Sequence, residues 1–283
     1  MTIWQACILG LIQGATEFIP VSSSGHLTLI PWLFNWEFDP VLKSAFDVLT
    51  HWGTLVAVIA VFWRDLWALA LGGLRTLGGL RHGGIAGVIE QTQHDVQGRL
   101  AWLIVIGSIP AAALGVALED FFESLFGAPR VISILLLVTA GLLAFSEWKS
   151  AQGRKLETLT WLDAVLIGLG QATAIAPGIS RSGATMAAGL MRGIERGVAA
   201  RFSFLLSVPV IVGAGVWQLK DLFANSEWTA NLGPLLAGFG IAAIVGYVCI
   251  RFLLNYLRQG KLYVFAIYCA LVGTTCLIVS LIR

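Results

Sequence analysis

The sequence carries little charge for its length. Only 12% of its 283 residues are Asp, Glu, Lys or Arg, whereas 57% are hydrophobic and the mean hydropathy is +0.83. A soluble domain would carry about 25% charged residues. The surplus of apolar side chains requires lipid as the surrounding solvent. The sequence therefore predicts one integral membrane domain over residues 1–283, and no nucleic-acid partner is expected.

Cysteine is scarce, and no pairing or metal-like spacing connects the four residues present, Cys7, Cys249, Cys269 and Cys276. They are interpreted as small hydrophobic side chains, so no disulfide framework is expected. The N-terminus lacks a basic region followed by a small-residue cleavage site, which argues against a removable signal peptide.

Long apolar runs are abundant, and a membrane-spanning helix needs about 20 such residues. Six segments qualify, which predicts an all-α protein with about six transmembrane helices, at about 46–62, 100–118, 131–148, 200–219, 232–250 and 262–282. Segments 2–34 and 159–192 are apolar but broken by Pro, Ser and Gly. Segment 66–82 contains Arg75 and Arg81, so we interpret it as interfacial or as a poor span and leave it out.

Basic residues are distributed unequally between the two sides of these six spans. One side receives 13 Lys and Arg residues and the other receives four, including Lys220, with Arg181 in a broken segment completing the 18. Basic residues accumulate on the cytoplasmic side. We therefore expect a multi-pass membrane protein with both termini outside.

The two broken segments resemble each other. Residues 10–25, "GLIQGATEFIPVSSSG", and residues 168–183, "GLGQATAIAPGISRSG", share a Gln, a Pro, a serine cluster and a Gly, with one residue of slip. The six-span topology makes them enter from opposite faces, as in inverted-topology repeats whose broken helices meet near the midplane. We predict two re-entrant pairs of broken helices, with a first repeat at about 1–118 and a second at about 158–250.

The first broken segment concentrates polar groups. Gln13 and Glu17 share a helix face, and Ser22, Ser23 and His26 lie at the start of the next helix, after Pro20. The serines could simply be helix caps, and Glu17 could be a neutral buried acid. Ionisable groups inside a membrane are nevertheless functional candidates by default.

The second broken segment adds a cation. Arg181 lies between Ser180 and Ser182, and Thr185 is one turn further on. An Arg among hydroxyls and free N–H groups at a helix start suits an anion. Alternatively, Arg181 pairs internally with Glu17. Together the two segments hold what phosphoryl transfer needs, which is positive groups, a nucleophile or base, and an acid able to hold a divalent metal.

Asp47 and His51 are four residues apart at the start of the first full span. This spacing could ligate a metal. We interpret the two as a polar pair at the rim of the outer cavity mouth, because nothing else in the sequence completes a metal site.

Two motifs resemble the signatures of a known family. "QGATEFIPVSSSGH" (13–26) is similar to the (E/Q)xxxE and SS-x-G-H motif of the undecaprenyl-diphosphatase (bacitracin-resistance) family, and "PGISRSGAT" resembles its PGxSRSxxT signature. "FDVLTHWGTLVAV", "FWRDL", "GSIPAAALG" and "RFSFLLSVP" follow the family's order, so the resemblance runs from Gln13 to at least Pro209.

The resemblance implies a phosphatase of a bacterial inner membrane that hydrolyses undecaprenyl diphosphate to undecaprenyl phosphate and inorganic phosphate, and so recycles the lipid carrier of cell-wall synthesis. It implies the residue roles as well. Glu17, Ser22, Ser23 and His26 become the catalytic group, with Glu17 the metal ligand, and Gln13, Ser180, Arg181, Ser182 and Thr185 bind the substrate. Position 13 is Gln where many relatives have Glu, which puts a two-carboxylate metal site in doubt.

The expected cofactor is Mg²⁺ or Ca²⁺, and the expected partners are the polyprenyl diphosphate lipid, the bilayer and, as an open alternative, a second copy in a homodimer. The diphosphate would enter from the outer side. Either Ser23 attacks with His26 as base, or His26 attacks, or His26 activates water; the shared helix face of Ser23 and His26 favours the first. The alternative function is a transporter or flippase for a polyprenyl phosphate lipid, which would use the same anion-binding cavity without needing His26.

Overall fold

The computed structural model describes residues 1–151, 153–224 and 231–283, without the side chains of 219–224, so Lys220 lies outside the described side chains. Over these ranges the chain is helical, and an isolated bridge joins Arg154 to Ile194. The α-helices are α1 (Ile3–Phe18), α2 (Ser23–Leu33), α3 (Pro40–Leu77), α4 (Leu80–His94), α5 (Val96–Ala117), α6 (Glu119–Phe126), α7 (Pro129–Lys149), α8 (Trp161–Thr173), α9 (Arg181–Met191), α10 (Arg196–Ala224), α11 (Leu232–Tyr256) and α12 (Tyr263–Ile282).

Six helices in the described ranges are long and apolar enough to cross a membrane: α3, α5, α7, α10 over Arg196–Gln218, α11 and α12. They coincide with the six predicted spans, so this prediction is confirmed. Their outer faces carry exposed apolar side chains such as Ile244 and Leu271, each more than 60% exposed. Exposed apolar surface of this extent is typical of a protein region that contacts lipid or another apolar surface.

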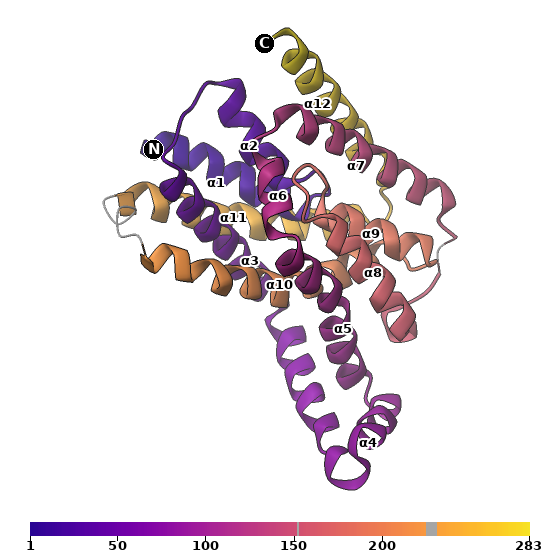
Figure 1. The fold of residues 1–283 in the computed structure, drawn as a ribbon. Helices are drawn as coiled ribbons and strands as arrows, with labels where there is room; N and C mark the ends of the chain where they lie inside the picture. Colours follow the sequence, from indigo (N-terminus) through magenta and orange to yellow (C-terminus); the bar gives the residue numbers. More distant parts are fainter. Residues whose placement is uncertain (152, 225–230) are drawn as a thin grey trace.

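Among the described residues, 66–82 forms no separate span, which agrees with leaving this segment out of the six. The first part of this segment continues α3, which has 38 residues and a kink at Phe62 (φ −109°, ψ 18°). At 1.5 Å per residue α3 is about 57 Å long, well beyond the hydrocarbon thickness of about 30 Å. Its far half, α4 and the first turns of α5 project from the body of the molecule (Figure 1). There the Trp102 indole donates to Thr76 Oγ1 at 2.9 Å, which ties α5 to α3.

Both broken segments form pairs of short helices, as the sequence predicted. The first helix of each pair opens on a threonine capping box, at Thr2 for α1 and at Thr160 for α8. The second helix of each pair opens on a serine, Ser22 for α2 and Ser180 for α9, whose hydroxyl accepts the backbone N–H three residues on. These side chains satisfy donors that a helix start would otherwise leave without partners. The two hairpins therefore share their capping pattern.

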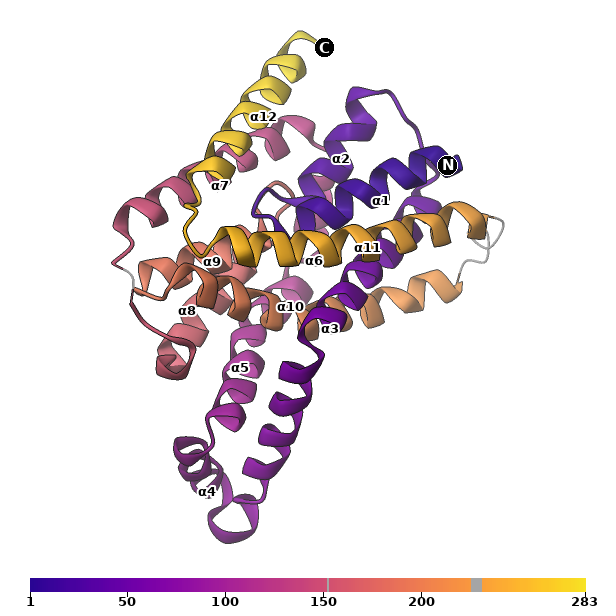
Figure 2. The same ribbon diagram turned by 180° about the vertical axis from the view of Figure 1, so that it is seen from behind.

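The hairpins also share a packing pattern. Helix α1 packs along α11, side by side in Figures 1 and 2, and α8 packs along α5. Glycines allow the close approach in both cases, because Gly10 faces the backbone of Gly238 and Gly168 faces that of Gly107. Helix α3 also packs on α11, and α10 packs on α5. Each hairpin thus rests on a helix from the other half of the chain.

Candidate active site

Each hairpin has a turn between its two helices, and the two turns meet inside the protein. Thr139 of α7 donates its hydroxyl hydrogen to the carbonyl of Gly178 (2.9 Å) and accepts the N–H of Ser180 (3.1 Å). Ser22 Oγ lies 3.5 Å from the Ile179 carbonyl oxygen. Gly178 has φ +101°, a conformation that a side chain would strain. The starts of α2 and α9 are therefore held against each other.

Glu17 is the centre of a polar cluster built at this meeting point. One carboxylate oxygen accepts from Arg181 Nη2 at 2.9 Å. The other accepts from Ser23 Oγ at 2.7 Å and from Gln13 Nε2 at 3.1 Å. Glu17 is only 5% exposed. The internal Arg181–Glu17 pair considered from the sequence is present, and Glu17 is an ion-paired carboxylate rather than an isolated acid.

Two polar atoms of this cluster are buried without a hydrogen-bond partner in the described part of the chain. They are Arg181 Nη1 and Gln13 Oε1. A buried donor or acceptor left unpaired costs free energy, so such atoms need an explanation such as a ligand or ion. Arg181 is the first residue of α9, where the free N–H groups of a helix start add to its positive charge. The cluster is suited to an anion.

His51 of α3 also reaches Glu17, which the sequence interpretation did not anticipate. Its Nε2 lies 3.6 Å from a Glu17 carboxylate oxygen, and its Nδ1 lies 2.7 Å from the Asp47 carbonyl oxygen. The Asp47 carboxylate instead pairs with Lys43. Asp47 and His51 thus share one backbone contact, while their side chains have different partners. The signal available in the sequence was a histidine inside a span, which is a functional candidate by default.

His26 and Ser23 are not hydrogen-bonded to each other in this structure, although their shared helix face predicted a pair. His26 Nδ1 lies 2.7 Å from the carbonyl oxygen of Ser22, and Nε2 lies 2.9 Å from the hydroxyl of Tyr268 in α12. The Ser23 hydroxyl is bonded to Glu17 instead. The reason is local, since the backbone carbonyl four residues before His26 captures its ring. Tyr268 was missed because it is 242 residues away.

Ser22 has an unusual backbone conformation. Its φ of +71° lies in a region that residues other than glycine rarely adopt. Backbone strain of this kind is typical of functional sites, where the surrounding structure holds it in place. It directs the Ser22 hydroxyl to cap α2 while its carbonyl binds His26.

The remaining residues of the second motif face different ways. Ser180 caps α9, and its hydroxyl lies 3.2 Å from that of Ser182. Thr185 donates to the Arg181 carbonyl at 2.8 Å and lies 2.6 Å from the Ser203 hydroxyl of α10. Thr185 is thus placed in the packing between α9 and α10, and no bond joins it to Glu17 among the described residues.

The donor atoms of the cluster fit one divalent cation that needs only a few protein ligands. No group of three or more His, Cys, Asp or Glu side chains that could hold a metal occurs in the described ranges. The oxygen donors at hand are the Glu17 carboxylate, the unpartnered Gln13 Oε1 and Ser23 Oγ. Mg²⁺ is commonly held by one or two carboxylates together with substrate phosphates and waters. The residues fit such an ion only if a phosphate group completes its shell.

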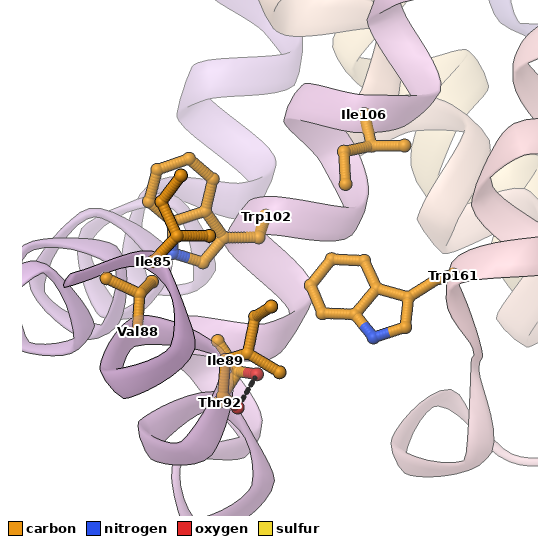
Figure 3. A pocket seen from close by; sticks show the side chains of 7 residues that line it. All are labelled: Ile85, Val88, Ile89, Thr92, Trp102, Ile106 and Trp161. Atoms are coloured by element: carbon orange, nitrogen blue, oxygen red, sulfur yellow. Dashed lines mark hydrogen bonds between the residues drawn. The ribbon is translucent and has the colours of Figure 1, made fainter. Parts of the chain in front are cut away.

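Two open hollows lie elsewhere and are apolar. One, of about 490 Å³, lies between α4, α5 and the start of α8 and is lined by Ile85, Val88, Ile89, Thr92, Trp102, Ile106 and Trp161 (Figure 3). The other, of about 500 Å³, is lined by Ile59, Trp63, Leu66 and Trp67. Neither contains a residue of the Glu17 cluster. Their linings suit hydrocarbon and offer nothing to a diphosphate.

The sequence was compared with known proteins. Residues 6–275 match the family model described as "Bacitracin resistance protein BacA". An undecaprenyl-diphosphatase of Moorella thermoacetica is 44% identical over 268 residues, which cover 95% of this chain and 94% of the relative. The undecaprenyl-diphosphatases of Desulforudis audaxviator and Pelotomaculum thermopropionicum are 40% and 39% identical over 283 residues. These matches cover the whole of this chain, and 100% and 98% of the length of the two relatives. With the family match spanning nearly the whole chain, and with both signature motifs meeting at one polar cluster, this protein belongs to the bacitracin resistance protein BacA family.

Proposed function

We propose that the chain is a membrane phosphatase that hydrolyses undecaprenyl diphosphate to undecaprenyl phosphate and inorganic phosphate. The observation that carries this proposal is the direct contact between the two hairpins, where Arg181 of α9 pairs with Glu17 of α1 and Ser23 of α2 bonds to the same carboxylate. Full-length relatives at about 40% identity bear the name undecaprenyl-diphosphatase.

Arg181 is the proposed diphosphate anchor. Its Nη1 is free to donate, and the Ser180 hydroxyl and the N–H groups at the start of α9 lie beside it. Ser182 lies in the same first turn. A diphosphate bound here would draw Arg181 from Glu17, since phosphate oxygens accept charge-assisted hydrogen bonds strongly. The internal ion pair would then serve to hold Arg181 ready in the substrate-free state.

Ser23 is the proposed nucleophile. Its hydroxyl is 2.7 Å from Glu17, so the carboxylate can take the proton as Oγ bonds to the terminal phosphorus and the P–O bond to the lipid monophosphate breaks. Water then hydrolyses the phosphoserine and regenerates Ser23. His26, one turn along α2, is placed to move a proton in either step once its ring is free. This order replaces the pairing of Ser23 with His26 that the sequence favoured.

A divalent cation, Mg²⁺ or Ca²⁺, would be held by Glu17 and Gln13 together with the diphosphate oxygens. When bound it would neutralise phosphate charge that Arg181 alone leaves uncompensated. Gln13 supplies a neutral oxygen where a second carboxylate would bind more tightly.

We propose that the two halves form an inverted repeat with re-entrant hairpins, and that the termini and the mouth of the site lie on the outer side. The shared caps of α2 and α9 support this, as does the exchange of partners by which α1 rests on α11 and α8 on α5. The excess of basic residues on the opposite side supports the orientation.

The test is phosphate release from farnesyl diphosphate or a longer polyprenyl diphosphate by the protein in detergent, with and without EDTA. The Ser23→Ala, His26→Ala and Arg181→Ala variants would run beside Arg201→Ala, an exposed arginine paired with Asp65. We expect loss of about 10²- to 10⁴-fold in the first three variants and little change in the last. If wild type binds the lipid but releases no phosphate with any divalent metal, the phosphatase proposal fails and transport becomes the better explanation.

A further inference from the structure

The ring nitrogens of His26 have different and definable partners. Nδ1 faces the Ser22 carbonyl oxygen at 2.7 Å, and a carbonyl can only accept, so Nδ1 carries the hydrogen. In the neutral ring, Nε2 then holds the lone pair. The Tyr268 hydroxyl lies 2.9 Å from Nε2 and is the donor that this lone pair accepts. The nitrogen that could act on a substrate is therefore occupied.

Tyr268 contacts His26 on one side and reaches the molecular surface on the other. Its ring stacks on the imidazole with centroids 5.6 Å apart and an angle of 14°. It is nevertheless 42% exposed, and Val264 and Leu271, about one turn to either side on α12, are 58% and 65% exposed. These neighbours form a surface that faces hydrocarbon. The tyrosine side chain can therefore turn outward without leaving a buried cavity.

We propose that Tyr268 is a positioning residue that caps Nε2 of His26 in the substrate-free protein and turns toward the bilayer when a lipid diphosphate binds. This rests on the proposed phosphatase function. On this proposal, substrate binding breaks two contacts of the substrate-free protein. It draws Arg181 from Glu17, and it displaces the Tyr268 phenol from His26. The same arrangement also places the boundary between site and lipid at α2 and α12, where a polyprenyl tail would leave the diphosphate-binding cluster.

The Tyr268→Phe variant tests the cap, because phenylalanine keeps the ring and its stacking but removes the hydroxyl. Since no hydrogen bond then has to be broken on binding, KM for farnesyl diphosphate should fall about 2- to 10-fold, and kcat should stay within about twofold. Tyr263→Phe is the matched control, since it makes the same change on the same helix at a side chain without a hydrogen bond in the described ranges. It should leave both constants unchanged.

The substrate-free protein supplies a second readout that does not depend on turnover. In ¹⁵N-histidine NMR, with His26→Ala used to assign the signal, the Nε2 resonance of His26 should shift in Tyr268→Phe toward that of an unbonded ring nitrogen, and not in Tyr263→Phe. A static Nε2 signal, a KM that does not fall, or a collapse of kcat at unchanged KM each overturns the cap. Wild type without phosphatase activity but with the expected NMR shift would reject the proposed function and leave the Tyr268 contact standing.

Discussion

Glu17 is held by side chains from three helices besides its own, with Ser23 from α2, His51 from α3 and Arg181 from α9. A carboxylate buried in this way would be costly if any of its partners were removed, because a buried charge needs compensation. The cluster therefore explains why residues of both motifs lie together. Serine caps or an isolated buried acid would not explain this.

His51 is the residue for which the structure changes the expectation most. We predict that His51→Ala lowers phosphate release about 10- to 100-fold, because its Nε2 lies 3.6 Å from the Glu17 carboxylate and the imidazole is part of the polar surroundings of that charge. His82→Ala, at an exposed position in α4, should release phosphate at the wild-type rate. Equal rates in the two variants would mean that His51 is only a bystander to Glu17.

At the scale of elements, the contact between α1 and α11 depends on glycine. A Cβ at Gly10 would meet the Gly238 carbonyl oxygen at 2.6 Å and its Cα at 2.9 Å, whereas a Cβ at Gly240 meets nothing within 4 Å. We predict that Gly10→Ala destabilises the protein by about 1–3 kcal/mol. Gly240→Ala should be neutral or stabilise it by up to about 1 kcal/mol through helix propensity.

The measurement for this pair is unfolding in detergent, followed by circular dichroism. An added Cβ at Gly10 would push α1 away from α11. Phosphate release at a temperature where both variants are folded would show whether this shift of α1 also moves Glu17. If Gly10→Ala is as stable as Gly240→Ala, the close approach of the two helices is not as the structure has it.

A second contact between elements lies outside the six spans, at the start of α8. The Asp163 carboxylate is fully buried and accepts from Arg154 (2.6 and 3.1 Å), from Arg192 (2.7 Å) and from Thr160. Burial by itself would raise the pKa of Asp163, but the hydrogen bonds from the two arginines and Thr160 outweigh it and hold the pKa well below its ordinary value. Folding is therefore linked to the ionisation of this group.

The sign of that linkage sets the pH dependence. A lowered pKa in the folded state stabilises the protein fully above the ordinary Asp pKa of about 3.9, and this contribution is lost as the pH falls through the folded-state value. We predict that wild type exceeds Asp163→Asn in stability by about 1–3 kcal/mol at pH 7, and that the difference shrinks below about pH 4. Glu157→Gln, an exposed carboxylate nearby, is the control for unfolding curves at each pH. A difference that is constant with pH would contradict the assignment.

At the scale of the whole molecule, the proposed orientation puts Asn35 outside and the projecting α4 in the cytoplasm. Both Asn35 and Gln93 are exposed. In a background without the four native cysteines, a membrane-impermeant maleimide should label Asn35→Cys in intact cells, but Gln93→Cys only after lysis. The reverse pattern would invert the orientation and move the mouth of the site to the cytoplasmic side.

The sequence by itself determined the six apolar spans and the two broken segments. Six spans follow from hydropathy alone, because the hydrocarbon core selects for length and apolarity regardless of which helices touch. The breaks in residues 2–34 and 159–192 are equally local, since Pro20, Pro177 and the serines after them interrupt and restart a helix within a few residues.

Only the tertiary structure decided which groups meet. Glu17 lies 164 residues from Arg181, and His26 lies 242 residues from Tyr268, so no local periodicity links them. Ser23 and His26 share a helix face, but each has another partner in the structure. Ser23 bonds to the Glu17 carboxylate, and His26 contacts the Ser22 carbonyl and the Tyr268 hydroxyl. In the same way, the far half of α3 is stabilised by packing against α5. The composition of residues 66–82 gives no sign of this contact.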